Sequence, residues 1–228
     1  KANDFVLYPT TEGQYYTLSE LKEAIKANQT DKNDTLVVLY AQNKEQQYTA
    51  IEEAKAKGYQ VLLLDSPIVS HLIQKLEEKN EKLTFARVDA APLSKLIQKD
   101  EPILAKHSEE EKNTLKADIE KVLPKEGYMV QIEDLDSDDT PFVINQPEFM
   151  RRMKEMSATG GGGMFGAFPE MYHVVVNANA PLADAILAAD EAAKEKFIKQ
   201  AFDLARLSQG LLKGKELSEF VKRNWEIC

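Results

Sequence analysis

The sequence has few of the features that would tie it to a membrane, a secretory pathway or nucleic acid. Its one cysteine, Cys228, permits no disulfide within the chain, which favours a reducing compartment such as the cytoplasm. No apolar run approaches the roughly 20 residues that cross a bilayer, and Lys1–Thr11 has no signal-peptide pattern. Lys and Arg number 29 against 38 Asp and Glu, whereas nucleic-acid binding normally needs a basic face. We therefore expect a cytoplasmic protein with no membrane or nucleic-acid partner.

Phosphate-binding and catalytic motifs are also missing. The glycine run 160–163 lacks the preceding strand, the lysine and the Ser or Thr that let a P-loop converge on phosphates. The three histidines, His71, His107 and His173, fall in different predicted elements at no metal-ligand spacing. No Ser, Cys or Asp stands in a recognisable activating pattern. We expect no catalytic residue, no metal site and no bound cofactor in this chain.

An acidic run gives a partial match to a calcium-binding loop. Asp134, Asp136 and Asp138 occupy the first three ligand positions of an EF-hand. The sixth position requires glycine and holds Asp139, and the twelfth requires glutamate and holds Asn145. The run is therefore interpreted as a solvated acidic turn.

The first half of the sequence, residues 1–103, alternates short apolar runs with amphipathic stretches. Because this order implies parallel strands joined by helical crossovers, it predicts a small three-layer α/β domain. The expected strands are 5–8, 36–40, 61–64 and 83–88, and the expected helices are 18–28, 45–57, 67–78 and 93–97. Gly58 stands where a helix end favours glycine. The sequence begins without an initiator Met, which indicates a piece of a longer protein.

The second half, residues 106–228, reads as an α+β domain that follows a linker around residues 98–106. Ser108 and Glu111 form a capping box that opens a helix to about Leu123. Strands are expected at 127–132 and 142–144, paired like a hairpin, with another at 171–176. Helices are expected at 147–156, 181–189, 192–208 and 216–227.

A methionine-rich segment in this half predicts an adaptable apolar surface. Methionine is unbranched and polarizable, so it conforms to varied partners. The residues that would form this surface are Phe149, Met150, Met153, Met156, Met164, Phe165 and Phe168. The alternative is an ordinary amphipathic helix packed in the core.

The last two predicted helices carry broad apolar stripes. The candidate dimerisation residues are Phe197, Ile198, Ala201, Phe202 and Ala205 on one helix, and Leu217, Phe220, Val221, Asn224 and Trp225 on the other. Two such helices are half of a four-helix bundle, which a second copy would complete isologously as a homodimer. The alternative is that both helices pack onto the chain's own sheet.

Several segments together resemble the C-terminal half of the 90-kDa heat-shock chaperone family, in its bacterial form. Lys57–Leu64 resembles the family's KG-EVLLL strand, Asp139–Pro141 its TD(T/S)PA turn, Phe149–Met156 its methionine-rich helix, and Pro169–Asn177 with Pro181 its LEINP-HP region. Ser70 and His71 stand where many members have a Glu-Trp pair that contacts clients. The order and spacing of these segments carry the resemblance.

The resemblance implies the end of a middle domain followed by a dimerisation domain. It implies a homodimer through the two terminal helices, and client binding at the methionine-rich segment. ATP and Mg would belong to an N-terminal domain outside this sequence, so the chain would be a non-enzymatic part of an ATP-dependent chaperone.

A different class of function is kept as the alternative. Ligands of parallel α/β sheets bind beyond the carboxyl ends of the strands, here near Ala41 and Asp65. A small-molecule or nucleotide-binding enzyme would use that position, although no glycine fingerprint follows either strand.

Overall fold

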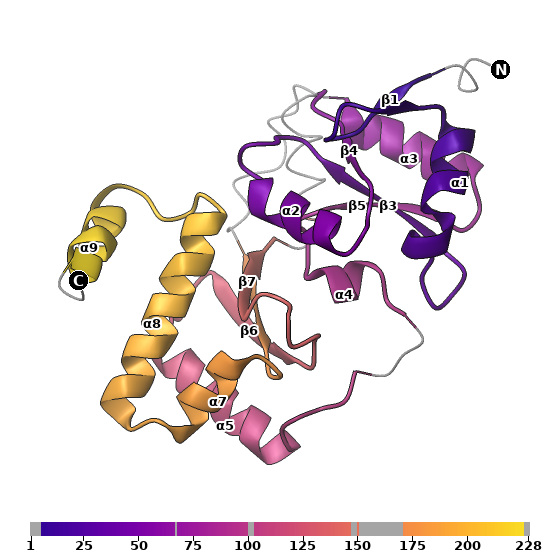
Figure 1. Cartoon of the computed structure of the whole chain (residues 1–228). Helices are drawn as coiled ribbons and strands as arrows, with labels where there is room; N and C mark the ends of the chain where they lie inside the picture. The colour runs from indigo at the N-terminus through magenta and orange to yellow at the C-terminus, as the bar shows by residue number, and fades with distance from the viewer. Residues whose placement is uncertain (1–5, 67, 100–102, 147–149, 151–170, 226–228) are drawn as a thin grey trace. The chain divides into compact units, whose positions relative to one another are not determined.

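The computed structural model describes residues 6–66, 68–99, 103–146, 150 and 171–225 (Figure 1). The chain divides into two compact units, the first holding elements β1 to α4 and the second holding α5 to α9. Each unit has its own core, and each is described by itself.

The first unit is built on a three-stranded parallel sheet in the order β4-β3-β5. Its strands are β3 (Leu36–Ala41), β4 (Val61–Leu63) and β5 (Leu83–Arg87). Alternate residues of β3 enter two different cores, because successive side chains of a strand point to opposite faces. Val38 and Tyr40 pack with α1 (Leu18–Gln29) and α3 (Val69–Lys79), whereas Val37 and Leu39 pack with α2 (Tyr48–Ala56) and α4 (Leu93–Leu96).

Both outer strands of this sheet are covered by the unit's own residues. A short antiparallel pair, β1 (Tyr8–Pro9) and β2 (Tyr15–Tyr16), lies beside β4, where the Thr11 amide donates to the Val61 carbonyl. The sequence did not predict β2. On β5, the Glu77 carboxylate of α3 accepts the Phe85 amide at 2.8 Å and the Thr84 hydroxyl at 3.2 Å.

The second unit has a mixed sheet in the order β6-β8-β7. Its strands are β6 (Tyr128–Glu133), β7 (Phe142–Asn145) and β8 (Tyr172–Asn177). The predicted hairpin-like pairing of the first two strands is wrong, because β8 lies between them, parallel to β6 and antiparallel to β7. The physical reason is burial. Val174, Val175 and Val176 form a continuous buried run, which suits a central strand.

Three helices pack on one face of this sheet: α5 (Glu109–Val122), α7 (Pro181–Ala188) and α8 (Glu191–Ser208). The predicted capping box of α5 is confirmed, since Ser108 and Glu111 exchange side-chain to backbone hydrogen bonds. Asp118 of α5, 7% exposed, pairs with Lys194 of α8 at 2.9 Å and ties the two helices together. The last helix, α9 (Gly214–Trp225), begins two residues before its expected start.

Two buried asparagines fix the loops at the end of β8. Asn177 accepts the Leu135 amide and donates to the Asp136 carbonyl. Asn179 donates to the carbonyls of Leu104 and Leu135, and its side-chain oxygen accepts the Lys106 amide at 2.9 Å. The acidic turn and the segment that enters the unit are thereby held at one point.

Candidate interaction surface

The ten predicted dimerisation residues fall into two groups in the structure. Four residues of α8 pack in the core of their own unit: Ile198, Ala201, Phe202 and Ala205. Phe197 is 40% exposed, and on α9 Val221 and Trp225 are 43% and 75% exposed. Leu217 and Asn224 are half-buried, and Phe220 is buried. The predicted stripe on α8 therefore faces mainly inward, as in the alternative interpretation, whereas the stripe on α9 faces mainly outward.

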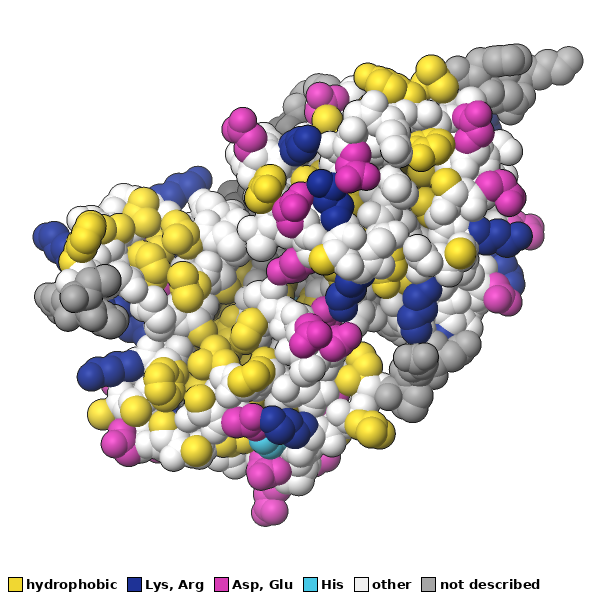
Figure 2. Space-filling view, in the orientation of Figure 1, with side chains coloured by type: hydrophobic (Ala, Val, Ile, Leu, Met, Phe, Trp, Pro, Cys, Tyr) yellow, Lys and Arg dark blue, Asp and Glu magenta, His cyan; other side chains and the backbone are white. Residues whose placement is uncertain are grey.

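A second apolar stripe on α8 faces solvent. It consists of Phe197, Leu204 and Leu207, whose spacing of seven and three residues places them on one side of the helix. On α9, Leu217, Val221 and Trp225 recur every four residues and form a similar line. Figure 2 shows hydrophobic side chains exposed over both helices. We call these six residues the α8–α9 apolar face. Two of them, Leu204 and Leu207, were not among the predicted site residues, although a helical projection of α8 separates them from the inward set.

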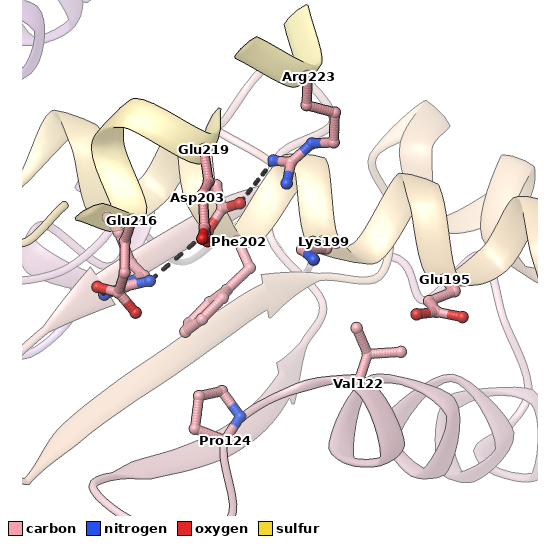
Figure 3. A pocket seen from close by; sticks show the side chains of 10 residues that line it. Val122, Pro124, Glu195, Lys199, Phe202, Asp203, Glu216, Glu219 and Arg223 are labelled. Atoms are coloured by element: carbon pink, nitrogen blue, oxygen red, sulfur yellow. Dashed lines mark hydrogen bonds and ion pairs between the residues drawn. The ribbon is translucent and has the colours of Figure 1, made fainter. Parts of the chain in front are cut away.

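The two helices are joined mainly by polar side chains. Arg223 of α9 donates to Asp203 of α8 at 2.6 Å, and Gln200 of α8 donates to Asn224 of α9 at 2.9 Å. Arg206 of α8 forms an ion pair with Glu216 of α9. Figure 3 shows Asp203 and Arg223 pointing toward each other from the two helices. These contacts set how the two halves of the apolar face are aligned.

A charged cavity of about 290 Å³ lies beside these contacts. Its lining comes from the end of α5, from α8 and from α9 (Figure 3): Val122, Pro124, Glu195, Lys199, Phe202, Asp203, Arg206, Glu216, Glu219 and Arg223. Arg206 lies over the Phe202 ring, 5.5 Å from its centre. Burial opposes its charged form, but the ion pair with Glu216 prevails and the pKa of Arg206 is raised. The cavity wall therefore stays charged.

The predicted client-binding residues are mostly outside the described part of the chain. Phe149, Met153, Met156, Met164, Phe165 and Phe168 lie there, and Met150 is half-buried.

The carboxyl ends of β3 and β5 are occupied by the chain's own side chains. The Gln47 side chain accepts the amides of Gln42 and Asn43, directly after β3. It also donates to Asp89, which follows β5 and pairs with Arg87. The backbone amides of Gln42 and Asn43 are therefore already bonded and are not free to hold a phosphate.

The acidic turn and the histidines show no arrangement of metal ligands. Asp134 pairs with Lys112 at 2.8 Å, and His107 lies 2.9 Å from Asp184, which also pairs with Lys106. Within the described residues, no group of three or more His, Cys, Asp or Glu is placed to hold a metal ion. None of the helices described there is long and apolar enough to cross a membrane.

Comparison with curated proteins finds relatives that share one name. A scan of protein families finds no match. Among curated proteins, the chaperone protein HtpG of Bacteroides fragilis is 31% identical over the whole chain, and that of Bacteroides thetaiotaomicron is 30% identical over the whole chain. HtpG of Porphyromonas gingivalis is 36% identical over 86% of the chain. The chain spans 44% of the length of the Bacteroides proteins and 29% of the Porphyromonas protein, and matches their C-terminal part.

Proposed function

Because this chain belongs to the HtpG family of chaperone proteins, we propose that it is part of a molecular chaperone that assists the folding of other proteins. Its own task is to join two copies into a homodimer and to contribute to the binding of unfolded clients. The binding and hydrolysis of ATP, with Mg, belong to other parts of the longer protein, which acts in the cytoplasm. This part binds no cofactor of its own.

The observation that carries the dimer is the α8–α9 apolar face. Phe197, Leu204 and Leu207 are between 40% and 49% exposed, and Trp225 is 75% exposed. Large apolar side chains gathered on one surface are characteristic of protein interaction sites. The sheet of the second unit offers α9 no further cover on its helical face, because α5, α7 and α8 already pack there.

A second copy is the partner that fits this face. Two neighbouring helices that expose apolar side chains on a common side form half of a four-helix bundle. An isologous dimer completes the bundle. In such a dimer every contact occurs twice, so moderate apolar contacts add up to a stable assembly. Pairing also raises the effective concentration of any other site carried by both copies.

The dimer is tested by measuring the mass in solution. Light scattering is expected to give twice the chain mass of 25.7 kDa. Val221→Glu places an uncompensated charge in the apolar interface, and we expect it to raise the dimer Kd by about 100-fold. Deleting residues 216–228 is expected to give a monomer.

Met129→Glu is the matched control. Met129 lies on β6 and is 47% exposed, so the substitution adds the same charge to a similarly exposed apolar position away from α8 and α9. Equal weakening by both variants, or a monomer at micromolar concentration without any substitution, would contradict the proposed dimer.

Client binding is proposed from the methionine-rich segment and the family relationship. Met153→Ser with Met156→Ser is expected to weaken the binding of an unfolded protein about tenfold, because thioether surface that packs on apolar clients is lost. The dimer mass is expected to remain. Binding is measured by fluorescence anisotropy of a labelled unfolded protein, and an unchanged affinity would reject the assignment.

A further inference from the structure

Within one copy, α9 is attached to the rest of its unit mainly by charge. Among the described α9 residues, Phe220 alone is buried, at 8% exposure. Three polar links hold the helix against α8, namely Arg223 with Asp203, Glu216 with Arg206, and Asn224 with Gln200. Asp203 is shared, because it also lies 3.6 Å from Arg206. The position of α9 therefore depends on an ionic network more than on a packed core.

The charged cavity lies along one side of α9. Glu216, Glu219 and Arg223 reach it from α9, and the opposite wall comes from α8 and the end of α5 (Figure 3). Glu216, Glu219 and Arg223 are spaced by three and four residues, which sets them on a different side of the helix from Val221 and Trp225. A cavity of about 290 Å³ separates this side of α9 from the opposite wall. Few van der Waals contacts therefore stabilise the position of α9 on this side.

The connection between α8 and α9 contains a pivot. Gly210 follows the C-cap of α8 with a φ of 64°, and the Leu211 amide donates to the Arg206 carbonyl. Leu212 is then buried at 3% exposure and anchors the connection. Gly214 begins α9 at a φ of 56°, and a Cβ at this position would meet no atom within 4 Å. Because glycine adopts positive and negative φ with little cost, a change of backbone angles at Gly214 would reorient α9.

We infer that α9 is a hinged arm and that its ionic docking on α8 sets how strongly two copies pair. This inference rests on the proposed dimer, since it concerns the regulation of the same surface. In the docked position, the α8 and α9 stripes lie next to each other and form one apolar face. When the ionic links open, the face is divided and less apolar area is buried on pairing.

Ionic strength is the variable that separates this device from an ordinary apolar interface. Salt screens the links between α8 and α9, since the Debye length falls from about 10 Å at 0.1 M to about 3 Å at 1 M. Apolar contacts are not weakened by screening. A purely apolar dimer would therefore keep its affinity in salt, whereas a dimer that needs the docked arm loses affinity.

The test measures the dimer Kd by sedimentation equilibrium at roughly 0.1 M and 1 M NaCl. We expect the Kd of the unmodified chain to rise about tenfold with salt. Arg223→Gln removes one of the two ionic links to α8, so its Kd is expected to be already raised at low salt and to depend less on salt than that of the unmodified chain. Arg223→Lys retains the charge and is expected to restore the salt dependence.

Lys215→Gln is the control, since it removes a positive charge from α9 without removing a link to α8. Lys215 pairs with Glu219 of the same helix at 3.6 Å and is 88% exposed. We expect this variant to behave like the unmodified chain. Equal effects of Lys215→Gln and Arg223→Gln would show that net charge, and not docking, governs the dimer, and would overturn the inference.

Hydrogen exchange of the amides of Gly214–Trp225 measures directly how often α9 opens from its docked position. We expect exchange to accelerate several-fold in high salt and in Arg223→Gln. If neither the dimer Kd nor the hydrogen exchange of α9 changes with salt, the inference is overturned. The proposed dimer is then still supported. A chain that is monomeric in every salt would overturn the proposed dimer together with its regulation, while salt-dependent exchange would still identify a hinged arm.

Discussion

Helices α3 and α9 are of nearly equal length, with 11 and 12 residues, and both are amphipathic, yet they bury very different amounts of apolar surface. Val69, Ile73 and Leu76 of α3 are each at most 2% exposed, against the sheet of the first unit. In α9 Phe220 is buried, while Trp225 is 75% exposed. An amphipathic pattern therefore indicates that a helix packs against another apolar surface. It does not indicate whether that surface belongs to the same copy of the chain.

The comparison is tested most strongly by removing a buried side chain of α3. Ile73→Ala is expected to destabilise the first unit by about 3 kcal/mol, because it leaves a cavity in a closely packed core. Hydrogen exchange of the β3 amides reports the opening of this unit. Ile68→Ala is the control, since Ile68 is 63% exposed just before α3, and we expect a change under about 0.5 kcal/mol. Equal losses would mean that α3 is not the packed helix described above.

A smaller effect is expected from the ionic contact between α5 and α8. Asp118→Asn is expected to cost about 1 to 2 kcal/mol, because Lys194, 15% exposed, loses its main partner. Glu120→Gln is the control, because Glu120 pairs with Lys116 at the surface. Urea unfolding followed by circular dichroism compares the two. A loss as small as that of the control would show that α8 is held by its apolar contacts alone.

The same carboxylate gives a pH dependence with a definite sign. The hydrogen bond from Lys194 is the main cause that lowers the pKa of Asp118 in the folded protein. Its contribution to stability is therefore complete above the ordinary value of about 3.9 and is lost as pH falls through the lowered pKa. We expect the unmodified chain to lose more stability than Asp118→Asn below about pH 4. Parallel pH profiles would contradict this assignment.

The smallest effect on stability is expected at the end of α9. Trp225→Ser is expected to change the free energy of unfolding of the monomer by less than about 0.5 kcal/mol, because the side chain is largely exposed in one copy. The same substitution is expected to raise the dimer Kd at least tenfold, since aromatic side chains carry much of the energy of interfaces. Unfolding at a concentration below the Kd separates the two quantities. A large loss of monomer stability would place Trp225 in the core.

Sequence patterns predicted the features whose causes are local. Ser108 and Glu111 formed a capping box because the two side chains are three residues apart on the first turn. Gly58 takes a φ of 74° after α2, as a helix end requires. Strands β3 and β4 were recognisable as continuous apolar runs. In each case the residues that decide the structure are neighbours in the sequence.

The features that were missed depend on residues far apart in the sequence. The position of β8 between β6 and β7 joins strands more than 25 residues apart, and no local pattern fixes that order. The bonds of Asn179 to Leu104 and Leu135 span 75 and 44 residues. An asparagine in a sequence does not show which distant carbonyls it will meet.

The candidate site was partly predictable for a related reason. Both terminal helices were expected to be apolar on one side, but α8 carries two apolar stripes. Ile198 and Phe202 face the sheet, whereas Phe197 and Leu204 face outward. The choice between the stripes depends on where α5 and α7 lie, so it required the structure.

The Glu77 carboxylate affects whether another polypeptide can pair with the edge of the first unit's sheet. Among the described strands, β5 lies at an edge of its sheet, and an open edge offers backbone donors to any extended polypeptide nearby. Glu77 already occupies the Phe85 amide. A strand of another polypeptide would have to displace the Glu77 carboxylate before it could form backbone hydrogen bonds with β5 at this position. The bonded carboxylate therefore disfavours the addition of a further strand along β5.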